Sequence, residues 1–138
     1  MRDRPASGLI DYRQLRVYRD AFDAANVIFR LADGWPPAER YMLSQQIIRS
    51  SRSVCANIGE AWFKKKYPKH FVAKLNDAGS EAMETLVWLE FALKHEYVSE
   101  ATYSELTRQL RGVTAGLIKM SNQPEKWCFP SSRPETTD

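Results

Sequence analysis

The chain of 138 residues has the length of one domain, and its 43% hydrophobic and 27% charged residues are ordinary values for a globular protein. Two cysteines are too few for a disulfide framework or a cysteine-based zinc site, and no apolar run has the length of a signal peptide or a membrane span. A net charge of +3 excludes no class of partner, and we therefore expect a cytoplasmic protein of one domain.

The first predicted element is an amphipathic helix over residues 12–33, preceded by a flexible segment over residues 1–11. Its apolar residues recur every three or four positions at Leu15, Tyr18, Phe22, Ala25 and Phe29, with Ala21, Ile28 and Ala32 beside them. Gly34 is a typical C-terminal stop, and the following Trp35-Pro36-Pro37 forces an extended turn, because a residue before proline avoids the helical region.

The second and third helices are predicted over residues 37–65 and 69–95, separated by Tyr67-Pro68. The second has an apolar seam rich in small side chains, which consists of Leu43, Ile47, Ser50, Val54, Ile58 and Ala61. The seam of the third consists of Phe71, Leu75, Ala78, Ala82, Leu86, Leu89 and Leu93. Glycine is unfavourable within a helix, so Gly79 predicts that the small face of the second helix packs closely against the third.

A fourth helix is predicted over residues 99–120, with Ser99 as its N-cap. Its heptad seam consists of Tyr103, Leu106, Leu110, Val113, Leu117 and Met120. Short connections between four long helices predict an all-α, antiparallel up-and-down four-helix bundle. The polar residues 121–138 indicate a disordered tail, in which Trp127-Cys128-Phe129 either docks on the bundle or forms an isolated apolar island.

The helices also carry more apolar surface than one stripe each. The additional large side chains are Trp62, Phe63, Met83, Val87, Trp88 and Phe91. They fit either a wide core stripe with some exposed aromatics or an interface between copies of the chain, and we favour the interface because large exposed apolar patches usually mark one.

No catalytic or metal centre is apparent. A di-iron bundle needs Glu-x-x-His on two helices, whereas Ala92 stands three residues before His95 and Tyr67 three before His70. No glycine-rich phosphate loop is present, and we predict no metal, no cofactor and no enzymatic activity. We expect Cys55 to be a buried small hydrophobic residue.

Charge is divided along the chain. Residues 44–74 contain seven basic residues against one acid, Glu60, whereas residues 75–105 contain seven acids against one base, Lys94. The candidates for phosphate contacts are Arg49, Arg52, Lys64, Lys65, Lys66, Lys69 and Lys74. The alternative for the cluster at 64–70 is a solvated helix end, where cations complement the helix dipole. Glu60 is predicted to form an ion pair with Arg49, Arg52 or a partner chain.

Two stretches form a recognisable signature. The first reads Pro37-x-Glu39-x-x-x-Leu43-x-x-Gln46-Ile47-x-Arg49-Ser50-x-x-Ser53-Val54-x-x-Asn57-Ile58-x-Glu60, and the second reads Phe71-x-x-x-Leu75-x-x-Ala78-Gly79-Ser80-x-x-Glu84. They resemble the bacterial four-helix-bundle proteins encoded in 23S ribosomal RNA intervening sequences, whose relatives include the accessory variability proteins of diversity-generating retroelements. The most specific parts are Asn57, Glu60, Gly79 and Ser80.

The resemblance implies a bundle that assembles as a homopentameric barrel. In the retroelement branch it further implies binding of nucleic acid and contact with a reverse transcriptase. We therefore predict a non-catalytic oligomeric scaffold that binds RNA or DNA, as an accessory to a reverse transcriptase or to ribosomal RNA. The alternative is a protein–protein adaptor that does not itself bind nucleic acid.

Overall fold

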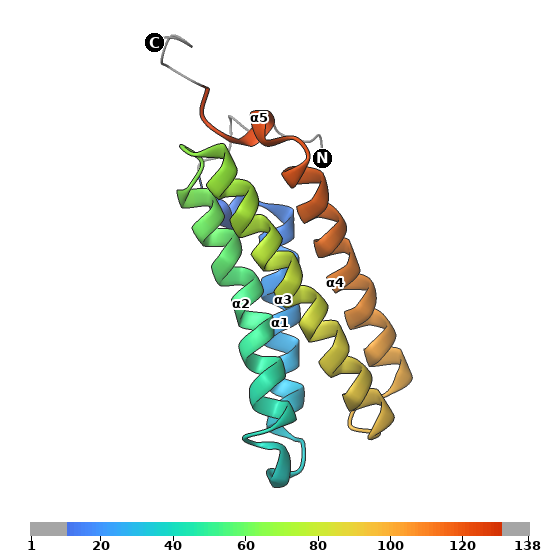
Figure 1. The fold of residues 1–138 in the computed structure, drawn as a ribbon. Coiled ribbons are helices and arrows are strands. Elements are labelled where there is room, and N and C mark those ends of the chain that lie inside the picture. The colour runs from blue at the N-terminus through green and yellow to red at the C-terminus, as the bar shows by residue number, and fades with distance from the viewer. Residues whose placement is uncertain (1–10, 131–138) are drawn as a thin grey trace.

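The computed structural model describes residues 11–130, and four long helices form most of it (Figure 1). The elements are η2 (Tyr12–Gln14), α1 (Arg16–Asp33), η3 (Pro37–Glu39), α2 (Leu43–Phe63), α3 (Pro68–Lys94), α4 (Glu100–Ser121) and α5 (Pro124–Trp127). The described residues contain no strand, so the prediction of an all-α chain built from four long helices is confirmed. None of the described helices combines the length and the apolar character needed to cross a membrane.

Each long helix packs against two others. α1 and α3 both contact α2 and α4, while α1 and α3 lie diagonally across the core, where their described backbones do not approach each other closely. Figure 1 shows the turn after α1 and the turn after α3 at one end, and the turn after α2 at the other end beside α5. The core has one cluster near each end, the first around Phe71 and Leu117 and the second around Trp35 and Leu89.

The seams predicted for α2, α3 and α4 are confirmed almost throughout. Every predicted seam residue of α2 is buried, as are those of α3 except Leu93 and those of α4 except Tyr103. The Ser99 hydroxyl accepts a hydrogen bond from the Thr102 backbone N–H at 3.1 Å, as its predicted N-cap role requires. Apolar periodicity therefore placed three of the four buried faces correctly.

α2 begins six residues later than predicted. Pro37–Glu39 forms a separate 3-10 turn, and Met42 at φ −123° and ψ −107° interrupts the helix before Leu43. The Glu39 carboxylate accepts the Leu43 backbone N–H at 3.2 Å and the Tyr97 hydroxyl at 2.8 Å. Glu39 thus satisfies a backbone donor at the start of α2 and ties the two turns at this end together.

The buried face of α1 matches the prediction only in part. Phe22 and Phe29 are 49% and 44% exposed, whereas Ala21, Ala24 and Ile28 are fully buried. The prediction is therefore wrong for the two phenylalanines, whereas the other predicted positions except Tyr18 are buried, namely Leu15, Ala21, Ala25, Ile28 and Ala32. Small side chains on the buried face let α1 lie close to its neighbours, so the bulky rings lie at the edge of the helix.

α2 and α3 pack closely, with the Ser50 and Thr85 hydroxyls 2.8 Å apart in the core, but Gly79 does not lie at that contact. The tightest contact at a glycine lies between α1 and α4. A Cβ atom on Gly116 would lie 2.5 Å from Val17 Cγ1, whereas a Cβ on Gly79 would meet no atom within 4 Å. The prediction that Gly79 accommodates the small face of α2 is therefore wrong. Gly116 is the glycine that packing requires, because Val17 is β-branched and has little rotamer freedom in a helix.

Gly116→Ala is expected to destabilise the protein, and Gly112→Ala, on the same helix, to stabilise it. Overpacking costs about 1–3 kcal/mol, which exceeds the gain of about 1 kcal/mol that alanine has over glycine in a helix. A Cβ on Gly112 would meet no atom within 4 Å, so that variant keeps the gain without the clash. Urea unfolding of both variants tests this, and equal free energies of unfolding would contradict the close contact.

The C-terminal segment packs on the bundle beyond Met120. α5 follows α4 after a short break, and Trp127 and Cys128 pack half-buried against the first core cluster. The prediction of disorder from residue 121 is therefore wrong for residues 121–130, because these apolar side chains gain buried area among polar neighbours. The rest of that predicted tail, residues 131–138, and residues 1–10 of the predicted flexible segment lie outside the described residues.

Candidate nucleic-acid interface

Three lysines, Lys64, Lys66 and Lys69, lie close together where α2 ends and α3 begins. The Tyr67 backbone N–H donates to the Lys64 carbonyl at 2.8 Å, which closes a tight turn before Pro68 starts α3. Lys66 and Lys69 are exposed and Lys64 is half-buried. Within residues 11–130, none of the three lysines has an ion-pair or hydrogen-bond partner for its amino group. Their amino groups are therefore available to a ligand.

Lys65 is different, although it belongs to the same run. Its side chain is buried, and Nζ lies 3.3 Å from the ring centroid of Trp62 and 4.9 Å from that of Phe129. Burial lowers the pKa of this amino group, and the Lys65 carbonyl accepts the Phe129 backbone N–H at 3.3 Å. The prediction that Lys65 contacts phosphate is wrong. Its ammonium instead holds the C-terminal segment to the end of α2 by cation–π contacts.

Arg49 and Lys74 lie further along the helices and are neutralised. Arg49 forms ion pairs with Glu84 at 2.8 Å and Glu81 at 3.3 Å, and the hydrogen bond to Glu84 raises its pKa. Lys74 pairs with Glu60 at 2.7 Å and more weakly with Asp77 at 3.7 Å.

Two sequence predictions change with these pairs. Glu60 has Lys74 as its partner in place of Arg49 or Arg52. The guanidinium of Arg52 lies 5.2 Å from the ring centroid of Phe29 on the neighbouring helix. Arg52 is exposed and has no acidic partner among the described residues, so it stays a predicted phosphate contact. Lys64 and Lys66 of the turn, with Lys69 and His70 in the first turn of α3, form a cluster that we call the basic turn.

A groove runs beside the basic turn. It has a volume of about 880 Å³ and is formed by η2, α1, α2 and α3. Its lining includes Tyr12, Tyr18, Cys55, Phe63, Lys64 and His70. Burial raises the pKa of the Cys55 thiol to about 11, so the thiol stays protonated and unreactive where it lines the groove. The burial predicted for Cys55 is confirmed.

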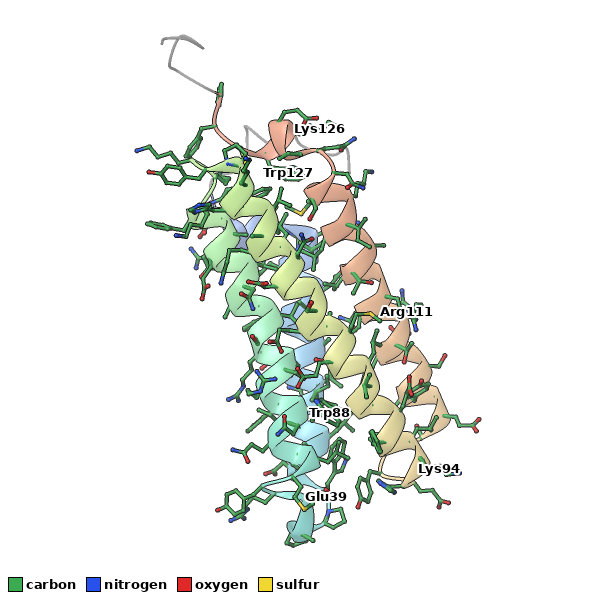
Figure 2. The ribbon with its side chains drawn as sticks, viewed as in Figure 1. Glu39, Trp88, Lys94, Arg111, Lys126 and Trp127 are labelled. Atoms are coloured by element: carbon green, nitrogen blue, oxygen red, sulfur yellow. The ribbon has the colours of Figure 1, made fainter. Side chains whose placement is uncertain are left out.

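Sequence reasoning missed three residues at this end of the molecule. Tyr12 and Tyr18 line the groove, with ring centroids 4.9 Å apart, and Lys126 on α5 is exposed at the same end as the basic turn (Figure 2). The apolar run Trp127-Cys128-Phe129 was the signal for the docked C-terminal segment. Nothing in the periodicity of α1 distinguished Tyr18 as a groove residue from a core residue.

The residues predicted for an oligomer interface separate into two groups. Phe63 is 84% exposed, and Met83, Val87 and Phe91 form a stripe on α3 that is nearly half exposed. Trp62 and Trp88 are half-buried and pack against the two core clusters, and Trp88 Nε1 donates to Glu84 at 3.0 Å. Phe22 and Phe29 of α1 join the exposed group.

Residues 13–119 match the family described as 23S rRNA-intervening sequence protein. The chain belongs to this family. A solved structure from Bacteroides thetaiotaomicron, a protein of unknown function from the S23 ribosomal protein family, is similar with 30% sequence identity and a TM-score of 0.69 over 77% of this chain and 95% of that one. No curated protein matches the chain.

The signature residues of the 23S rRNA-intervening sequence family do not converge on one site here. Glu39 lies at one end of the bundle (Figure 2), where its carboxylate accepts hydrogen bonds from α2 and from Tyr97. Glu60 pairs with Lys74 near the other end. The Asn57 amide donates to the Ser53 carbonyl at 2.9 Å. Gln46 and Ser80 are exposed, and Gly79 is half-buried. The part of the chain that the structure describes contains no group of three potential metal ligands.

Proposed function

We propose that this member of the 23S rRNA-intervening sequence family is a non-catalytic scaffold that binds nucleic acid through the basic turn. The observation that carries the proposal is that Lys64, Lys66 and Lys69 lie together at the junction of α2 and α3 with no partner for their amino groups among the described residues, while Arg49 and Lys74 are neutralised. Each lysine that contacts a phosphate releases condensed counterions, so unpaired lysines contribute most to binding. The ribosomal RNA in the family's name makes RNA the first ligand to test.

We further propose that the helices alternate in direction and that copies assemble into a closed ring, the pentamer that the family resemblance implies. The ring is supported by two different apolar stripes. One consists of Met83, Val87 and Phe91 on α3, and the other of Phe22 and Phe29 on α1. α1 and α3 are diagonal in the bundle. Unlike surfaces on different sides of a protomer favour head-to-tail contacts, which close into rings, over the self-complementary contact of a two-fold dimer.

Light scattering combined with a salt titration tests this function. We expect a particle several times the chain mass of 15.9 kDa, and binding of a labelled RNA whose log affinity falls linearly with log salt. Three phosphate contacts per chain on a single strand predict a slope of about −2. A monomer at micromolar concentration would refute the ring, and affinity that does not change with salt would refute the phosphate contacts.

The second candidate is a protein adaptor, for which a reverse transcriptase is the partner suggested by the resemblance. It is favoured by the exposed stripe of Met83, Val87 and Phe91, which a partner protein would cover. Stoichiometric capture of one protein after nuclease treatment would support the adaptor, and loss of capture after nuclease treatment would favour the scaffold.

A further inference from the structure

We infer that the groove beside the basic turn holds an unpaired base, so that this protein selects single-stranded over double-stranded nucleic acid. The inference rests on the proposed function, because the phosphates that flank such a base would contact the basic turn. It adds a second kind of contact, aromatic stacking, to the electrostatic one.

The groove has the composition of a stacking site. Aromatic rings of Tyr12, Tyr18 and Phe63 line it, and they come from η2, α1 and the last residue of α2. Between them lie small residues of α2, including Gly59, where an added Cβ would meet no atom within 4 Å. Small residues between aromatic ones leave room for a flat ring, and every base has a face that stacks on an aromatic side chain.

Phe63 is the most informative residue of the groove. Its side chain is 84% exposed, so the bundle itself does not bury it. It directly precedes Lys64, which lines the same groove. An exposed aromatic ring next to an unpaired lysine offers a base face and a phosphate contact to neighbouring parts of one nucleotide.

The charges around the groove favour an anionic ligand. Lys64 lines it with an amino group and His70 with an imidazole ring, whose centroid lies 5.6 Å from that of Tyr67. The groove's acid, Glu60, is held by Lys74 at 2.7 Å, so its charge is compensated. Lys66 and Lys69 lie just beyond, where adjoining phosphates of the strand would reach them.

This arrangement distinguishes single strands from duplexes. In a duplex the faces of the bases are covered by stacking, and only the backbone and groove edges reach a protein. A duplex can therefore contact Lys64, Lys66 and Lys69 but cannot fill the groove. Only a strand with an unpaired base can use both.

The test compares a single-stranded RNA of about twelve nucleotides that contains 2-aminopurine with its duplex, using the full chain and three proteins: wild type, Phe63→Ala and Tyr41→Ala. Tyr41 is the matched control, because it is also an exposed aromatic, 76% exposed, in the turn just before α2. Fluorescence anisotropy gives the affinity, 2-aminopurine emission reports stacking, and light scattering gives the particle mass.

We expect Phe63→Ala to weaken single-strand binding about 5- to 100-fold, the range for losing one stacked base, and to leave duplex binding unchanged. Tyr41→Ala should change neither. Three results for Phe63→Ala would refute base binding in the groove: an equal loss of affinity for the duplex, no loss for the single strand, or a changed particle mass. A changed mass would mean that Phe63 faces another copy of the chain. In each of those cases, salt-dependent RNA binding by the wild type would still support the proposed function. If the wild type bound no RNA at all, both the proposed function and base binding in the groove would be refuted.

Discussion

Replacing Lys64, Lys66 and Lys69 together by glutamate is expected to lower the affinity for RNA on the order of 100-fold at physiological salt. The estimate follows from losing three phosphate contacts and their counterion release, and the added repulsion increases it. The same variant should lose most of the salt dependence of binding. Fluorescence anisotropy at several salt concentrations measures both quantities.

A charge-matched control separates this local effect from net charge. Arg40, Lys94 and Arg111 are also exposed cations, and Figure 2 shows Lys94 and Arg111 away from the basic turn, on α3 and α4. Reversing these three changes the net charge by the same amount and should lower affinity much less. Equal losses in the two triple variants would show that binding follows overall charge and would refute the basic turn as the site.

The triple variant should remain folded, which makes its binding interpretable. Within residues 11–130 the amino groups of Lys64, Lys66 and Lys69 have no protein partner, so no buried pair is broken. The main cost is at the C-terminus of α2, where Lys64 lies favourably in the helix dipole, at about 0.3–1 kcal/mol. Far-UV circular dichroism and urea unfolding check this directly.

Phe71→Ala is expected to have the largest effect on stability, a loss of about 3–5 kcal/mol in the free energy of unfolding. Phe71 is 1% exposed and is the largest fully buried side chain in the described part of the chain. Removing its ring leaves a cavity in the first core cluster, which joins α1, α2, α3 and α4. A typical domain is stable by about 5–15 kcal/mol, so this single change removes a large part of the total.

Phe63→Ala is the matched control, because it makes the same substitution where the ring is 84% exposed. Its effect on the free energy of unfolding should lie within about 0.5 kcal/mol. Urea unfolding of both variants gives the comparison. Similar losses in the two variants would show that Phe63 is buried in solution, which would support an interface at this residue and argue against the groove.

The sequence by itself determined the helices and most of their buried faces. The seams of α2, α3 and α4 each follow one unambiguous apolar period, and periodicity within a helix is a local property. The same holds for the Ser99 cap and for the position of Lys64, Lys66 and Lys69 at a turn, because Tyr67-Pro68 ends one helix and starts the next. Local chemistry was sufficient for these features.

Only the tertiary structure decided which face of α1 is buried and which cations are unpaired. Alanines and phenylalanines on α1 offered two overlapping stripes, and packing against α2 and α4 buries the alanines and leaves the phenylalanines partly exposed. Arg49 and Lys74 are neutralised by acids of α3 and α2, and Lys65 is buried by Phe129, whose position depends on the docked C-terminal segment. Whether a charge is paired depends on which side chains of other elements lie within a few ångströms of it. Packing between elements sets those distances, and the apolar period of a single helix does not encode that packing.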